Sequence, residues 1–169
     1  MSISLYHASV PVFRQMLLAL GDVLSKGEAH VEAKKLDPSV LLQTRLALDM
    51  FPLVRQVQIA CDFAKSVTAR LAAVEVPAYE DSEQTITELK ARIARTVALL
   101  DSMSEAQFVG SEALEIVLRP GTPKEKKLNG RAYLLAYGLP QFFFHVTTAY
   151  NLLRHNGIEI GKKDYMGSY

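Results

Sequence analysis

The sequence is poor in cysteine, has no tryptophan and carries almost no net charge. A single cysteine in 169 residues excludes an internal disulfide framework and a zinc site built from several cysteines. A formal charge of +1, from 19 basic and 18 acidic residues, gives no broad attraction to nucleic acid or to an anionic membrane. We therefore expect neither nucleic acid nor a membrane among the partners of this protein.

Long hydrophobic runs are also missing. No apolar stretch approaches the roughly 20 residues that span a bilayer. The first residues lack the basic start and the unbroken apolar run of a secretory signal. A chain of this length corresponds to one domain, with a core that buries about two-thirds of the surface of the unfolded chain. We expect a soluble, cytoplasmic protein with a single domain over residues 1–169.

Apolar residues recur at helical spacing in four segments, and such spacing lines one face of a helix. The four stripes are Phe13, Leu17, Leu20 and Leu24; Met50, Val54, Val57, Cys61, Ala64 and Leu71; Ile86, Leu89, Ile93, Val97 and Leu100; and Leu139, Phe143, Val146, Tyr150 and Leu153. The last segment has a second stripe beside the first, formed by Phe142, His145, Ala149 and Leu152. A helix that is apolar over so wide an arc must be largely buried.

Local signals mark the ends of these helices. Asp49 is expected to be the N-cap of the second helix, and Ser82 opens the third. Asn156–Gly157 is expected to end the last helix with a residue in the left-handed conformation. Between the third and fourth helices, residues 114–133 alternate in polarity around a turn, which predicts two short strands in a hairpin or an irregular excursion. The sequence therefore predicts an all-α protein, an antiparallel four-helix bundle with a small β-hairpin insertion.

Two groups of charges are interpreted as solvated surface. Glu88 and Arg92 form an i,i+4 pair of the kind found on exposed helix faces. Lys124, Lys126 and Lys127 follow the turn of the hairpin and could touch phosphates, but acidic neighbours make a wet loop the better interpretation. Nothing aromatic is interleaved with these lysines, which argues against a nucleic-acid surface.

The common catalytic motifs are absent, and the residues left for chemistry are polar groups on faces that should be buried. His145 lies within PQFFFHVTTAY, on an inward face, and each of its ring nitrogens needs a partner. It is either a core histidine bonded to another helix, or a metal ligand or active-site base. Both interpretations remain open on the sequence.

Asp49 is the second candidate for catalysis or metal binding. Besides capping a helix, a carboxylate opposite a buried histidine can coordinate a metal or orient the imidazole. Four further residues are expected to line a cleft near this pair: Gln56, His7, Tyr6 and Tyr150.

The segments RLALDMFPLVRQVQIACDFAK and LPQFFFHVTTAYNLLRHNGIEIGKKDYMG, together with residues 6–13, resemble a known family over nearly the whole chain. It is the bacterial domain-of-unknown-function family 1993, which is similar to the wider DinB/YfiT-like superfamily. The resemblance implies an up-down-down-up four-helix bundle that is commonly dimeric. It also implies relatives among metal-dependent thiol transferases and bacillithiol- or mycothiol-linked enzymes.

The superfamily's metal site takes one histidine from the second helix and a His-x-x-x-His pair from the last. The resemblance places His145 at the first position of that pair, but Ala149 stands where the second histidine is expected. The second helix offers Asp49 and Gln56 in place of its histidine. A divalent metal held by one histidine and one carboxylate would be weakly bound unless another group joined them.

Three functions follow from the sequence. The first is binding of a small molecule in a cleft near Asp49 and His145, with a degenerate or absent metal site and with catalysis left open. The second is a non-catalytic structural or interaction protein, and the third is a metal-dependent enzyme similar to the thiol transferases. A homodimer is expected because the helices are more apolar than one bundle requires.

Overall fold

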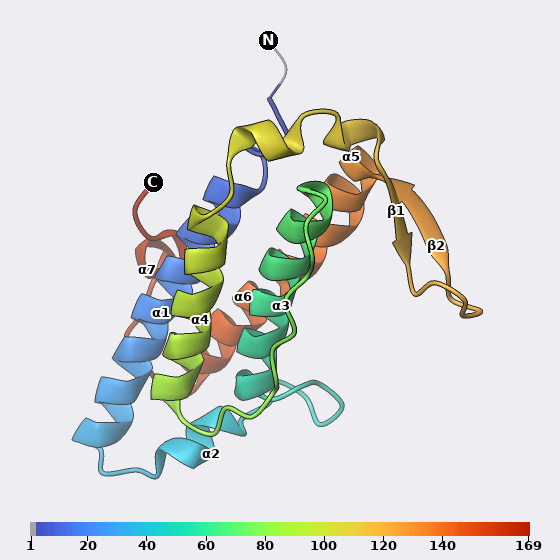
Figure 1. Cartoon of the computed structure of the whole chain (residues 1–169). Coiled ribbons are helices and arrows are strands. Elements are labelled where there is room, and N and C mark those ends of the chain that lie inside the picture. The colour runs from blue at the N-terminus through green and yellow to red at the C-terminus, as the bar shows by residue number, and fades with distance from the viewer. Residues whose placement is uncertain (1–2) are drawn as a thin grey trace.

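The computed structural model describes residues 3–169 and is mostly helical, with one small sheet (Figure 1). Four long helices dominate: α1 (Val10–Ala33), α3 (Leu53–Leu71), α4 (Ile86–Asp101) and α6 (Leu139–His155). The shorter helices are α2 (Pro38–Leu42), α5 (Gly130–Ala132) and α7 (Lys162–Met166), with single helical turns at Glu105–Phe108, Ser111–Ala113 and Tyr133–Gly138. Strands β1 (Glu115–Leu118) and β2 (Lys126–Asn129) form an antiparallel hairpin. The hairpin lies between the third and fourth long helices in the chain, as predicted.

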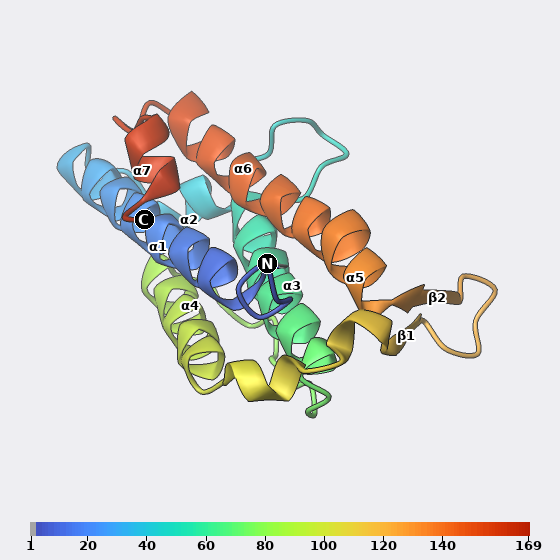
Figure 2. The same ribbon diagram turned by 90° about the horizontal axis from the view of Figure 1, so that it is seen from above.

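The long helices pack around a common interior. α3 lies against α6 and α4, and α1 lies against α4 and α6. Seen from above, the hairpin projects at one end of the helices, beside α5, and α7 lies on the outside of α1 (Figure 2). Within residues 3–169 none of the helices combines the length and the hydropathy of a bilayer-spanning segment.

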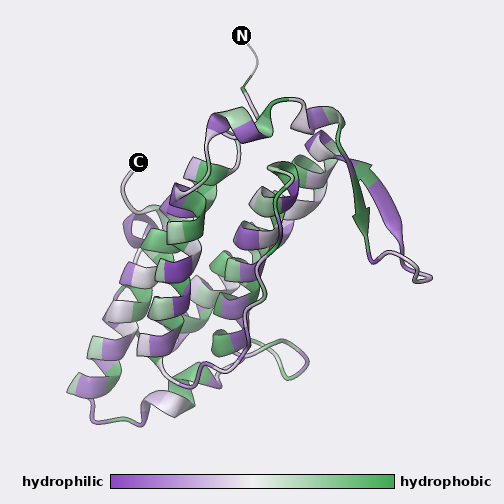
Figure 3. Cartoon of the chain, viewed as in Figure 1, coloured by the Kyte–Doolittle hydropathy of each residue, from purple (hydrophilic) through white to green (hydrophobic). Residues whose placement is uncertain are grey.

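Most residues of the predicted stripes form one continuous core. The exceptions are Met50, which lies in the loop before α3, and the partly buried Val54, Leu139, Phe143 and Tyr150. Phe13, Leu17 and Leu24 of α1 meet Leu89 and Leu100 of α4, all fully buried. Colouring by hydropathy shows apolar and polar faces alternating around the long helices (Figure 3). Cys61 is fully buried in this core, as predicted, and burial raises the pKa of its thiol to about 12.

The second long helix begins later than the sequence suggests. Pro52 is extended at φ −69° and ψ 166°, and α3 starts at Leu53. A residue that precedes proline is disfavoured in helical conformation, so the helix cannot extend back through Phe51 toward Asp49. The prediction that Asp49 caps this helix is therefore wrong, and Asp49 lies exposed in the preceding loop.

The third long helix is capped by Thr85 and not by Ser82. The Thr85 hydroxyl accepts a hydrogen bond from the Glu88 backbone N–H at 3.1 Å, and the Glu88 carboxylate accepts one from the Thr85 N–H at 2.9 Å. This reciprocal pair is a capping box, which satisfies two amides that would otherwise lack partners. Glu88 therefore serves the helix end and does not pair with Arg92.

The entry to α6 is irregular, and helical spacing did not predict it. Residues Tyr133–Gly138 form a π-helical turn before the helix. Pro140 in the first turn of α6 has no N–H and crowds the carbonyl four residues earlier, which favours a wider turn upstream. Gly130 precedes this segment, and a Cβ there would lie 1.9 Å from the Ser111 carbonyl oxygen, so only glycine fits. The end of α6 follows the prediction, with Gly157 at φ +86°.

Arg92 is the largest departure from the sequence-based interpretation. Its side chain is 2% exposed and its guanidinium pairs with Asp62 of α3 at 2.9 Å, Asp81 at 3.0 Å and Glu83 at 3.0 Å. Asp81 and Glu83 belong to the segment 72–85, which runs along α3 and α4 (Figure 1). Arg92 also donates to the Glu80 carbonyl at 2.9 Å. The predicted ion pair between Arg92 and Glu88 is therefore wrong. Arg92 instead connects the segment 72–85 to α3 and α4.

Replacing Arg92 with alanine is expected to lower the free energy of unfolding by about 3 kcal/mol, because three carboxylates would lose their buried partner. Urea denaturation measures the change. Arg131→Ala is the matched control, since its ion pair with Glu112 is exposed and is worth less than about 1 kcal/mol. Equal losses in the two variants would contradict a special role for the Arg92 cluster.

Candidate functional site

His145 projects from α6 into an aromatic environment. Its side chain is nearly buried, at 7% exposure. The ring stacks on Phe63 of α3, with centroids 6.0 Å apart and an interplanar angle of 15°. Phe144 meets the imidazole edge-on at 5.2 Å. These contacts fix the plane of the imidazole and leave its two nitrogens to polar neighbours.

Gln56 of α3 forms a hydrogen bond with one of those nitrogens, Nδ1. Its Nε2 donates to the Phe51 carbonyl at 3.0 Å, which determines the orientation of the amide. The Oε1 atom therefore faces His145, and it lies 2.7 Å from Nδ1. A carbonyl oxygen can only accept, so Nδ1 must carry the hydrogen. The Phe51 carbonyl and Gln56 together select one tautomer of His145.

The second nitrogen of His145 is free. Burial, and secondarily the charge of Arg55, lower the pKa of His145 to about 4, so the ring is neutral near pH 7. With its only proton on Nδ1, the ring presents a lone pair at Nε2. No hydrogen-bond partner of Nε2 occurs within residues 3–169, and Nε2 is not among the polar atoms sealed from solvent without a partner. His145 therefore offers an accessible hydrogen-bond acceptor or metal ligand.

A groove of about 600 Å³ lies between the hairpin and the start of α6. The residues lining it include Arg119, Lys124, Glu125, Lys126, Tyr137 and Gln141. Gln141 precedes His145 by four residues, so both lie on one face of α6. Phe63 contacts the rings of both Tyr137, at 5.8 Å, and His145. The groove and the imidazole are therefore linked along one side of the molecule.

The groove is rich in positive charge. Among the described residues, Arg119, Lys124 and Lys126 take part in no ion pair, whereas Glu125 accepts a hydrogen bond from the Gly121 N–H at 2.7 Å. Lys127 is the third lysine that the sequence places on a solvated loop. It forms an ion pair with Glu115 on the facing strand, at 3.4 Å. The remaining cations favour an anionic group in the groove.

The other residues expected at the cleft lie elsewhere. Tyr6 packs edge-on against Phe108 and His7, and His7 lies 3.2 Å from the Glu105 carboxylate. Tyr150 packs against Tyr165 of α7, at 5.6 Å. Asp49 is exposed in the loop before α3 and is not among the groups that contact His145. Of the expected set, only Gln56 is brought to His145.

The ligand set expected of the superfamily's metal does not form. Within the part of the chain that the structure describes, no three histidine, cysteine, aspartate or glutamate side chains converge. Ala149 is fully buried one turn beyond His145 and offers no ligand atom. Gln56 already uses both ends of its amide. The residues present do not fit a three-ligand metal site.

Phe63, Arg55 and the groove residues Tyr137 and Gln141 were not anticipated as parts of the site. Phe63 and Arg55 lie outside the apolar stripe of α3, and Tyr137 falls in the π-helical turn, where helical spacing fails. Gln141 was detectable, since it lies one helical turn before His145.

The pH dependence of stability tests the buried imidazole. The folded-state pKa of about 4 lies below the ordinary value of 6.5, so protonation opposes folding. We expect His145 to remove up to about 3 kcal/mol of stability as the pH falls from 6.5 to 4. Urea denaturation across this range should show a shallower pH dependence for His145→Phe than for the wild type. His155→Phe, at the exposed end of α6, serves as the control, and identical slopes in all three proteins would contradict the assignment.

Comparisons with known proteins agree with the resemblance seen in the sequence. The model of a family described as a domain of unknown function (DUF1993) matches residues 5–166. The chain is also similar to a crystal structure of a DinB family member protein from Shewanella denitrificans, with 45% identity and a TM-score of 0.92, over 98% of this chain and 93% of that one. No curated protein matches the sequence. The chain therefore belongs to the DUF1993 family, and it is DinB-like in structure.

Proposed function

We propose that this protein binds a small organic molecule that donates a hydrogen bond to Nε2 of His145. One observation carries the proposal: Gln56 accepts a hydrogen bond from Nδ1–H of a neutral, nearly buried imidazole, and within residues 3–169 the lone pair of Nε2 has no protein partner. Because Nε2 is accessible to solvent, the donor group of a ligand can reach it and form a hydrogen bond there.

Binding is favoured over proton abstraction. A general base works best when its pKa lies near the working pH. Burial lowers the pKa of His145 to about 4, so its free nitrogen is a weak base at neutral pH and a competent hydrogen-bond acceptor. The third function, a metal-dependent thiol transferase, receives no support from the ligand set around His145.

The groove beside the hairpin favours a ligand that carries a negative charge. Arg119, Lys124 and Lys126 line it, and Gln141 lies one turn of α6 from His145. We propose that the anionic end of the ligand lies in the groove while its donor group reaches the imidazole. Phe63 and Tyr137 would provide an aromatic wall between the two ends.

We also propose that the long helices follow the up-down-down-up order, in a single domain over residues 1–169. The colours in Figure 1 support this order: those of α1 and α6 advance toward the end where α2 lies, and those of α3 and α4 advance away from it. One shared hydrophobic core supports the single domain.

The binding proposal is tested with small aromatic probes. 4-Hydroxyphenylacetate carries both a donor and a carboxylate, phenylacetate lacks the donor, and 4-hydroxyphenylethanol lacks the charge. We expect the first to bind several-fold more tightly than either of the others, since phenylacetate lacks a hydrogen bond of about 1 kcal/mol and 4-hydroxyphenylethanol lacks the attraction between a carboxylate and the basic groove. The readout is the ¹⁵N chemical shift of His145 Nε2 during titration, with Zn²⁺ titrated separately.

Two variants give the controls for this titration. Gln56→Leu removes the acceptor at Nδ1 and should weaken binding of 4-hydroxyphenylacetate, although Gln56 does not face the ligand. Lys127→Ala should leave binding unchanged, because Lys127 pairs with Glu115 away from the groove. If none of the three probes shifts Nε2, binding at His145 is refuted; a stoichiometric response to Zn²⁺ alone would make this a metal site.

The second candidate, an interaction dimer, rests on exposed apolar side chains in the loop before α3. Leu48 is 99% exposed and Phe51 54%. Phe144 on α6 is 55% exposed and lies beside His145, whose partner Gln56 binds the Phe51 carbonyl. We propose that these exposed apolar side chains contribute to a surface that a second copy covers.

Light scattering tests the dimer. We expect the wild type at about twice the chain mass of 18.7 kDa, and Leu48→Asp combined with Phe144→Ser at the mass of one chain. Val109→Asp is the control, since Val109 is also exposed, at 83%, but lies beyond α4. A wild-type mass of one chain at high micromolar concentration would rule the dimer out.

A further inference from the structure

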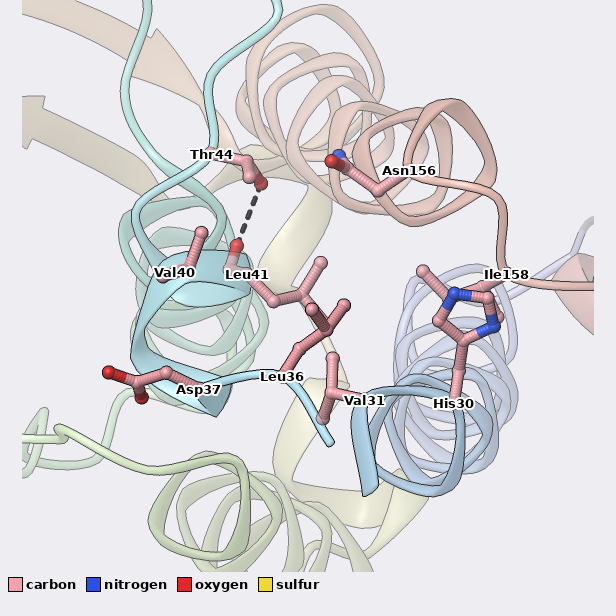
Figure 4. A pocket seen from close by; sticks show the side chains of 9 residues that line it. All are labelled: His30, Val31, Leu36, Asp37, Val40, Leu41, Thr44, Asn156 and Ile158. Atoms are coloured by element: carbon pink, nitrogen blue, oxygen red, sulfur yellow. Dashed lines mark hydrogen bonds between the residues drawn. The ribbon is translucent and has the colours of Figure 1, made fainter. Parts of the chain in front are cut away.

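A second pocket, of about 130 Å³, lies at the other end of the molecule, where α2 faces the end of α6 (Figure 4). Its walls are apolar and come from four parts of the chain: Val31, Leu36, Val40, Leu41 and Ile158. Val31, Leu41 and Ile158 are buried to 96% or more, so they form a closed floor. Leu36 and Val40 are more than half exposed and form an apolar rim.

Across the pocket from the His30 imidazole, two polar side chains offer acceptors (Figure 4). The Thr44 hydroxyl donates its hydrogen to the Leu41 carbonyl at 2.7 Å, which leaves its oxygen free to accept. The Asn156 Nδ2 donates to the Leu152 carbonyl at 2.7 Å, so the Oδ1 of that amide is also free. Figure 4 shows the amide of Asn156 directed toward Thr44, across the pocket from His30. A ligand would therefore meet a pair of acceptors on one side.

The charges around the pocket do not favour an anion. Among the described residues, no lysine or arginine lines it, His30 is the basic side chain there, and the carboxylate of Asp37 points away from the other lining side chains (Figure 4). That carboxylate accepts a hydrogen bond from the Ser39 N–H, at 2.9 Å, and thereby caps the start of α2. An uncharged ligand is therefore preferred over a carboxylate or a phosphate.

We propose that this pocket binds a small uncharged molecule with an apolar ring or short chain and one hydroxyl or N–H donor, which bonds to Thr44 and Asn156. The volume agrees with this class, because a dry cavity of about 150 Å³ holds benzene. The exposed rim of Leu36 and Val40 would be covered by the apolar part of the ligand.

This site is independent of His145. Asn156 follows His145 by eleven residues on α6 and its cap, about 16 Å along the helix axis. The two sites share no lining residue. His145→Phe protein should therefore bind a ligand here as the wild type does, which separates the failure of one proposal from the failure of the other.

The experiment compares three probes of similar size on the full chain: phenol, toluene and benzoate. Binding is followed by the backbone amide shifts of Thr44, Asn156 and Ile158. We expect phenol to bind about three- to tenfold more tightly than toluene, the effect of one hydrogen bond, and benzoate to bind least. Equal affinity for phenol and toluene, strongest binding of benzoate, or no shift at 10 mM phenol would each overturn the proposal.

Two variants identify the pocket as the source of the shifts. Val40→Phe places a ring at a half-exposed rim position, where folding is not at risk, and should abolish binding of both phenol and toluene. Thr44→Val keeps the shape of the side chain but removes an acceptor, so it should weaken phenol binding and leave toluene binding unchanged. Phenol binding that survives Val40→Phe would place the ligand elsewhere and refute the assignment.

Discussion

The inward faces of α1, α3, α4 and α6 meet in one apolar core, so any polar side chain on those faces must find its partner inside the protein. Thr68 and Thr96 do so locally, each donating to the carbonyl four residues earlier. Arg92 and Gln56 need partners from other segments of the chain. This requirement explains why both residues bond to groups at the boundary of the core.

The Arg92 cluster and the Gln56–His145 pair answer that requirement in different ways. Arg92 collects carboxylates from α3 and from the connection that precedes α4, and the cluster thereby fixes a long segment without regular structure. His145 receives one partner and keeps one free nitrogen. Most of the Arg92 guanidinium is paired, although its Nε is buried without a partner among the described residues, and no solvent or ligand can reach it there. Nε2 of His145 is accessible to solvent, and this accessibility is the physical basis for the binding proposal at His145.

The helices, their order and most of the core could be predicted from the sequence, because helical spacing of apolar residues reports directly on the buried face. Phe13, Leu89 and Leu153 illustrate this, since all are fully buried where the stripes placed them. Helix ends were less predictable. Asp49 is a residue type that commonly caps helices, but Pro52 restricts the residue before it to extended conformations, and α3 begins at Leu53.

The sequence by itself determined the family, the helical composition, the hairpin insertion and the unusual position of His145 among aromatic residues. Only the tertiary structure decided that Gln56, 89 residues away in sequence, meets its Nδ1, and that Tyr6, His7 and Tyr150 pack against other residues. It likewise moved Arg92 from an expected surface pair into a buried cluster. The physical reason is that spacing within one helix specifies which face is buried, whereas the partner of a buried polar group depends on the register between different helices.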